Sequence, residues 1–81
     1  MTEGGTLAQV MDIIRGVVDL DHHVVGQTAI EQIEGWDSLA SVNILLSLEE
    51  TFDIELPQED FFGAESIDDI VALLEECLRR G

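Results

Sequence analysis

The chain is poor in basic residues, cysteine and proline: it has three arginines, no lysine, one cysteine and one proline. Eighteen acids oppose the three bases, so the formal net charge is −15. Nucleic acids and anionic membranes are poor partners for such a charge, because both are themselves negative. One cysteine excludes an internal disulfide framework. No stretch resembles a signal peptide or a transmembrane span, so we expect no membrane insertion and a cytoplasmic location.

The acids are concentrated in one part of the chain. Between Glu49 and Asp69 there are nine acids and no base. Basic proteins are the natural partners of such a segment, because a field of one sign speeds encounters and rejects like-charged competitors. An equally open alternative is that the acids only keep the domain in solution.

The length of 81 residues predicts a single small domain over residues 1–81. A chain of this size has little room for a deep catalytic cleft. High net charge often accompanies disorder, but hydrophobic residues make up 46% of this chain and recur at helical spacing. The chain is therefore expected to fold.

A first helical pattern begins after Thr6, which can act as an N-cap. Its apolar residues recur at i, i+3, i+4 and i+7 spacing, and they are Leu7, Val10, Met11, Ile14 and Val17/Val18. The repeat predicts a helix that continues to about Leu20.

Residues 21–36 break this pattern with two glycines and form a loop longer than an ordinary connection in a compact domain. The sequence Thr28-x-x-Glu31 can cap one short turn inside the loop. Ile30 and Ile33 are expected to hold the loop against the core.

The longest uninterrupted helical pattern follows Asp37, which is predicted to be its N-cap. Its apolar face is expected to consist of Leu39, Val42, Leu45, Leu46 and Phe52. Ser38 then lies on the first turn, where backbone N–H groups have no intrahelical partners and the helix dipole is positive. A phosphate ester on the Ser38 hydroxyl would be in a favourable field there.

Two further helices are predicted in the second half of the chain. Pro57 suits the first turn of a short helix over residues 58–62, which Gly63 ends. Ser66 and Asp69 form a capping box before a repeat that runs to Arg79 and Arg80 and consists of Ile67, Ile70, Val71, Leu74, Cys77 and Leu78. The predicted fold is a small all-α four-helix bundle with three longer helices, a short third helix and a long loop between helices one and two.

The residues around Ser38 resemble those of acyl carrier proteins and the related peptidyl and D-alanyl carriers. The matching pattern is Trp36-Asp37-Ser38-Leu39-x-x-Val42, Leu46, Glu49-Glu50-x-Phe52-x-Ile54-x-Leu56-Pro57, Phe61, Ile67 and Ile70. It extends from the first helix to near the end of the chain. Asp37-Ser38-Leu39 at a helix start, after a long loop, is its most specific part.

The resemblance implies that Ser38 carries a 4′-phosphopantetheine arm, which a phosphopantetheinyl transferase takes from coenzyme A. The arm would hold an acyl or aminoacyl group as a thioester and present it to partner enzymes, so the chain is expected to be a non-enzymatic monomer with no catalytic residue of its own. Tethering raises the effective concentration of the cargo near successive active sites. Expected partners also include an acyl- or aminoacyl-loading ligase or transferase.

The resemblance also assigns roles around the attachment site. Asp37 would help to position coenzyme A on the transferase, and Leu39 and Val42 would contact partner enzymes. Glu49 and Glu50 would meet basic docking patches on those partners.

Two departures from the fatty-acid carriers, Asn43 in place of an acid and Trp36 in place of a small or aliphatic residue, favour polyketide, nonribosomal peptide or related specialised biosynthesis. Weak docking on fatty-acid synthesis enzymes is a hypothesis that follows from Asn43. A D-alanyl or other aminoacyl carrier for cell-envelope modification is an alternative, because such carriers share the Trp-Asp-Ser run. The Gly-Gly-x-Ser pattern of large-synthetase peptidyl carriers is not matched.

Other interpretations of single residues remain open at this point. The chain could be an acidic interaction domain without an arm, in which Ser38 is only an exposed helix serine. Trp36 is favoured as an anchor of the loop over an exposed contact. His22 and His23 are interpreted as solvent-exposed residues and not as metal ligands, and no metal is expected. Cys77 is expected to pack in the core.

Neither a Ser-His-Asp hydrolase nor a calcium-binding loop is supported by the pattern. Ser38 is not within a Gly-x-Ser-x-Gly elbow. Asp19-x-Asp21 is followed by His23 and Val24, where a calcium loop needs a third oxygen ligand and a glycine.

Overall fold

Helices account for the regular structure of the chain. The computed structural model describes residues 5–20 and 23–80, and its α-helices are α1 (Gly5–Arg15), α2 (Ser38–Phe52), α3 (Gln58–Phe62) and α4 (Ile67–Arg80). A short 3₁₀ helix, η1 (Ile30–Gln32), lies in the loop before α2. Within the described ranges there is no β-strand, only an isolated bridge between Ala29 and Ser66. The predicted all-α fold, with a short third helix and a long first loop, is confirmed.

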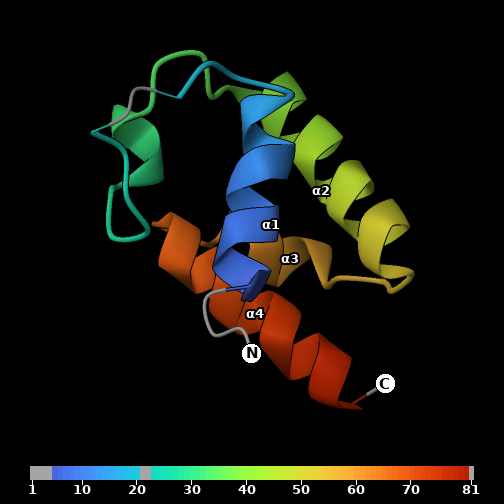
Figure 1. Ribbon diagram of the computed structural model, residues 1–81. Coiled ribbons are helices and arrows are strands. Elements are labelled where there is room, and N and C mark those ends of the chain that lie inside the picture. Colours follow the sequence, from blue (N-terminus) through green and yellow to red (C-terminus); the bar gives the residue numbers. More distant parts are fainter. Residues whose placement is uncertain (1–4, 21–22, 81) are drawn as a thin grey trace.

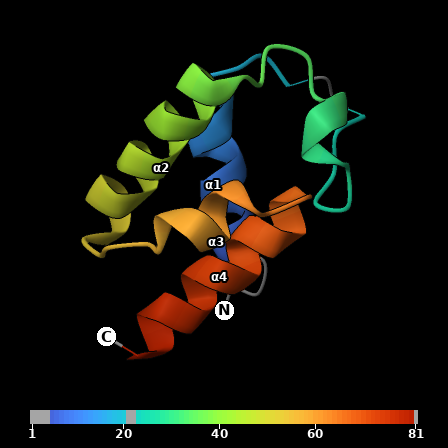
Figure 2. The same cartoon turned by 180° about the vertical axis from the view of Figure 1, so that it is seen from behind.

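Helix α1 is the common partner of the two other long helices. α1 packs against both α2 and α4, and α3 joins α2 to α4 (Figures 1 and 2). The loop with η1 runs from the end of α1 to the start of α2 (Figure 1). Over the described residues, no helix is both long and apolar enough to cross a bilayer.

The core is apolar and drawn from every helix and from the loop. Its buried side chains are Val10, Ile14, Val18, Ile33, Ala40, Ile44, Leu45, Leu48, Leu56, Phe61, Ile67, Ile70 and Leu74. Full burial of one large aliphatic side chain stabilises a fold by about 1.5–3 kcal/mol. No polar residue is buried among the described residues, so this burial is not offset by desolvated charges.

α1 is shorter at its C-terminal end than the periodicity predicts. It ends at Arg15, because the amides of Gly16 and Val17 turn back to the carbonyls of Ile13 and Ile14 at 3.1 and 2.9 Å. Val18 is nevertheless buried, so the apolar spacing continues although the helix does not. Gly16 is also a poor helix former. The predicted end at Leu20 is therefore wrong.

The predicted cap of α1 is also wrong. The helix already includes Gly5, so Thr6 lies inside it and is not its N-cap.

The short turn in the loop exists, but Thr28 does not cap it. The Thr28 hydroxyl accepts a hydrogen bond from the backbone N–H of Val25 at 2.9 Å, so it closes the preceding turn. Ala29 is the N-cap of η1, without a side-chain hydrogen bond. Ile33 is buried and Ile30 packs against the core, which confirms that these two residues hold the loop.

α2 turns a different face to the core than the one predicted. Its buried residues are Ala40, Ile44, Leu45 and Leu48. Leu39 and Leu46 are 69% and 55% exposed, and Val42 is exposed as well. Of the predicted face, only Leu45 is buried, and Phe52 packs partly against the core. We call Leu39, Val42 and Leu46 the outer strip of α2.

The predicted starts of α3 and α4 hold with changes of detail. Pro57 is the N-cap of α3 and not a residue of its first turn. The Ser66 hydroxyl accepts from the Asp69 N–H at 3.2 Å, whereas the Asp69 carboxylate accepts from the Glu65 N–H at 3.0 Å. Ile67, Ile70 and Leu74 are buried as predicted, and Leu78 is exposed.

Candidate functional site

A glycine turn sets the direction in which the chain enters α2. Gly35 has φ of +87°, a conformation that favours glycine, and the Trp36 N–H donates to the Ile33 carbonyl at 3.2 Å. This turn brings Trp36 back onto the bundle and points the next residues toward the start of α2.

Asp37 caps α2, as predicted. Its backbone is extended, and its carboxylate accepts from the Ala40 N–H at 2.8 Å. Ser38 is consequently the first residue of the helix, and it is exposed. Its hydroxyl lies where the first-turn N–H groups and the dipole favour an attached anion.

Trp36 anchors the loop, also as predicted. Its indole Nε1 donates to the Ser41 Oγ at 2.7 Å, and the side chain is half-buried against the core. Ser41 was missed from sequence as part of the site. Two features of the sequence could have indicated Ser41. A partly buried indole N–H needs a hydrogen-bond acceptor, and a serine occurs five residues after Trp36, near the predicted start of the helix.

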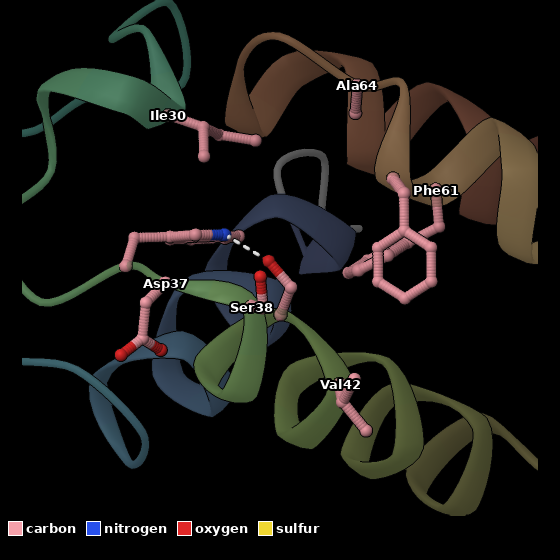
Figure 3. A pocket seen from close by; sticks show the side chains of 9 residues that line it. Ile30, Asp37, Ser38, Val42, Phe61 and Ala64 are labelled. Atoms are coloured by element: carbon pink, nitrogen blue, oxygen red, sulfur yellow. Dashed lines mark hydrogen bonds between the residues drawn. The ribbon is translucent and has the colours of Figure 1, made fainter.

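A cleft of about 550 Å³ opens beside Ser38. Its lining residues are Ile30, Trp36, Asp37, Ser38, Ser41, Val42, Phe61, Phe62 and Ala64. Ile30 and Ala64 lie across the cleft from Ser38 (Figure 3). Trp36 and Ser41, which are joined by the 2.7 Å bond, both line the cleft. The walls are mostly apolar, and Asp37 is the sole charged residue among those that line it. Sequence reasoning did not include Phe62 and Ala64 in the site, because they belong to the distant α3 region.

The predicted docking residues are not equivalent. Leu39, Val42 and Glu50 are exposed on α2. The Glu49 carboxylate instead accepts from the Leu56 N–H at 2.8 Å and is half-buried, so it helps to hold the segment before α3. Asn43 is exposed and lines a second groove with Leu46, Glu50 and the end of α1.

Of the histidine and cysteine residues that the structure describes, neither His23 nor Cys77 lines the cleft beside Ser38. His23 is exposed, and His22 lies outside the described residues. Cys77 is half-buried against the core on α4. Over the part of the chain that the structure describes, no three His, Cys, Asp or Glu side chains gather around a common point.

The site fits a phosphate-linked arm. The Ser38 hydroxyl is exposed, the helix start favours an anion, and the adjacent apolar cleft gives a neutral chain a surface to lie on. The Asp37 carboxylate uses one oxygen to accept from the Ala40 N–H, so the cap is compatible with a group on the neighbouring hydroxyl.

Comparison with known proteins agrees with this geometry. Residues 8–74 match the family described as "Phosphopantetheine attachment site". The D-alanyl carrier protein of Lactobacillus helveticus is 39% identical over 62 residues, which cover 68% of this chain and 78% of the relative. The D-alanyl carrier protein of Lactobacillus acidophilus is 38% identical over 58 residues, covering 63% and 73%. An acyl carrier protein of Akkermansia muciniphila is 43% identical over 42 residues, covering 52% of each chain.

A solved structure supports the same assignment. The solution structure of the holo acyl carrier protein of Geobacter metallireducens superposes with a TM-score of 0.79 at 29% identity, covering 93% of this chain and 87% of that one. The chain belongs to the family of acyl carrier proteins that bear phosphopantetheine.

Family membership confirms the predicted cofactor and the general role. The chain bears a covalent 4′-phosphopantetheine, and it is a carrier of acyl or aminoacyl groups and not an enzyme. It works with a phosphopantetheinyl transferase and with partner enzymes.

Proposed function

We propose that Ser38 is the residue to which the arm is attached. The observation that carries the proposal is an exposed hydroxyl on the first residue of α2, held by the Asp37 cap at the edge of an apolar cleft. In the transfer, the Ser38 oxygen forms a bond to phosphorus of coenzyme A, and the pyrophosphate P–O bond breaks. The 3′,5′-bisphosphate of adenosine leaves, and a base of the transferase takes the hydroxyl proton.

The outer strip of α2 is proposed as the surface that partner enzymes contact. Leu39, Val42 and Leu46 expose apolar side chains on one side of a helix whose other side is already buried. Exposed acids beside them, Glu50 above all, supply the charge that basic docking patches recognise. Glu49 contributes less, because its carboxylate is bonded to the Leu56 N–H. The domain spans residues 1–81 in this proposal and works as a monomer in the cytoplasm.

The cargo is proposed to belong to polyketide, nonribosomal peptide or related specialised biosynthesis. Asn43 carries this proposal, because it is exposed and lines the second groove next to Leu46, where it presents no charge to a basic partner. A second candidate is aminoacyl carriage for cell-envelope modification. The names of two relatives, both D-alanyl carrier proteins, favour it.

The two candidates differ in loading. A D-alanine-activating ligase with ATP would load the arm-bearing protein if the chain is an aminoacyl carrier, and it would leave the protein unloaded if cargo arrives from a specialised synthase. The intact mass after each incubation distinguishes the outcomes.

Attachment itself is tested by incubating the protein with coenzyme A and a broad-specificity phosphopantetheinyl transferase. We expect the wild type to gain the mass of one phosphopantetheinyl group and Ser38→Ala to gain nothing. Ser47→Ala is the matched control, because Ser47 is another α2 hydroxyl and should leave the gain intact. An unchanged wild-type mass would instead favour an acidic interaction domain without an arm, and the same gain in Ser38→Ala would place the arm elsewhere.

A further inference from the structure

Trp36 belongs to two parts of the molecule at once. It lines the cleft beside Ser38, and it also packs against the buried core. It is the only tryptophan in the chain. Its position is fixed by the Gly35 turn on one side and by the 2.7 Å bond from Nε1 to the Ser41 Oγ on the other. The indole therefore stands between the cleft and the interior of the bundle.

The interior of the bundle is already filled. Ile14, Ile44 and Leu48 have no exposed surface, and protein interiors of this kind are packed like organic crystals. A chain that entered the bundle on the side of the cleft where the indole lies would have to displace Trp36. Displacement would leave the indole N–H and the Ser41 hydroxyl without their bond, which is a cost that an alkyl group cannot compensate.

We propose that Trp36, positioned by Ser41, limits the cargo to the surface cleft and so selects short acyl or aminoacyl groups. A short group can lie on the apolar wall that Ile30, Val42 and Phe62 provide. A long alkyl chain gains no further burial, because Trp36 closes the way into the bundle. The inference rests on the proposed attachment of the arm to Ser38, and it identifies Trp36 as a specificity-determining residue of that site.

The test varies the length of the cargo and compares variants. A phosphopantetheinyl transferase loads the protein from coenzyme A and from acetyl-, butyryl-, octanoyl- and decanoyl-coenzyme A. The measured quantity is the melting temperature of each loaded form relative to the same variant carrying the bare arm. General destabilisation by a substitution cancels in this difference.

In the wild type, the shift should be the same for all cargo lengths. In Trp36→Ala, the shift should increase with length and reach at least about 4 °C between butyryl and octanoyl cargo, because the space left by the indole accepts the longer chain. Equal dependence on cargo length in both proteins would overturn the proposal.

Ser41 variants test the positioning bond and do not depend on the folding of Trp36→Ala. Ser41→Ala should acquire part of the length dependence, whereas Ser41→Thr keeps an acceptor and should behave as the wild type. Length dependence that is absent from Ser41→Ala, or equal in the two variants, would exclude Ser41 as the positioning residue.

Tryptophan fluorescence provides a second measurement, which does not depend on the stability of the protein or on any enzyme assay. In the wild type, emission of the sole tryptophan should change on loading by the same amount for butyryl and octanoyl cargo, and a larger change for octanoyl would contradict the proposal. The intact mass is taken first. If the wild type gains no mass, attachment at Ser38 is refuted. If the wild type is loaded but sequesters octanoyl cargo, only the role of Trp36 is refuted.

Discussion

Helices α2 and α4 are similar in length but carry different patterns of apolar residues. α4 has one buried stripe, Ile67, Ile70 and Leu74, and acids cover much of its remaining surface. α2 buries Ala40, Ile44, Leu45 and Leu48 and still exposes the outer strip on another side. A helix that only has to pack needs one apolar stripe. The second stripe of α2 is the exposed apolar surface that we propose for contact with partner enzymes.

The largest expected effect is a difference in stability between substitutions on the buried side and on the exposed side of α2. Leu48→Ala removes a fully buried side chain and should lower the free energy of unfolding by about 2–5 kcal/mol. Leu46→Ala makes the same chemical change on the outer strip and should alter it by no more than about 0.5 kcal/mol. Urea unfolding of both variants measures the difference. Equal losses would mean that the outer strip is part of the core.

The next largest effect is a difference in transferase rate between substitutions of two exposed leucines, one on the outer strip and one on α4. Leu39→Ala should lower kcat/KM for the phosphopantetheinyl transferase about tenfold, because it removes an apolar contact next to Ser38. Leu78→Ala is the control, since Leu78 is exposed on α4 and lies far along the chain from Ser38. A similar loss of rate in both variants would show that exposure alone, and not position on α2, is responsible.

The two helix starts provide a smaller test. Asp37→Ala removes the cap of α2 and should lower the free energy of unfolding by about 1 kcal/mol, whereas Asp37→Asn should retain most of the stability. Ser66→Ala removes the hydroxyl cap of α4 and should have an effect of the same order. Thermal unfolding monitored by circular dichroism is sufficient. Full stability of Asp37→Ala would mean that the N-cap bond contributes nothing.

The smallest effect distinguishes two neighbouring acids of α2. Glu49→Ala should cost about 0.5–1.5 kcal/mol, because the Leu56 N–H loses its acceptor. Glu50→Ala removes the same charge from an exposed position and should be neutral within about 0.5 kcal/mol. Because both variants relieve the same self-repulsion, a difference in melting temperature isolates the hydrogen bond. Identical melting curves would assign Glu49 to the surface alone.

The parts of the fold that sequence predicts well have a single physical cause. The α4 stripe follows from one apolar face, and the Asp37 cap follows from the chemistry of one helix start. The choice of face on α2 was wrong, because leucine occurs on both the buried and the exposed side and periodicity alone does not distinguish core from surface. The end of α1 was predicted too late for a related reason. Val18 continues the apolar spacing although the backbone is no longer helical there.

In the site, features that depend on neighbouring residues in the sequence were predicted, and features that depend on tertiary packing were not. The local motif Trp36-Asp37-Ser38 predicts where the arm belongs, and the cap and the anchor are both present in the structure. The cleft wall was not predictable, because Phe62 and Ala64 reach it only through tertiary packing. The bond that draws Glu49 away from the surface joins residues seven positions apart, beyond one helical period.

The contacts between the first loop and the start of α4 determine when the site can be completed during synthesis. The Ile30 N–H donates to the Glu65 carbonyl and the Asp68 N–H donates to the Gly26 carbonyl, both at 2.8 Å. A ribosome makes the loop well before it makes residues 65–68, so these two bonds form only after the start of α4 has been translated. The wall of the cleft beside Ser38 is therefore complete only after the start of α4 has been made, and a transferase that recognises the whole cleft cannot act before that point.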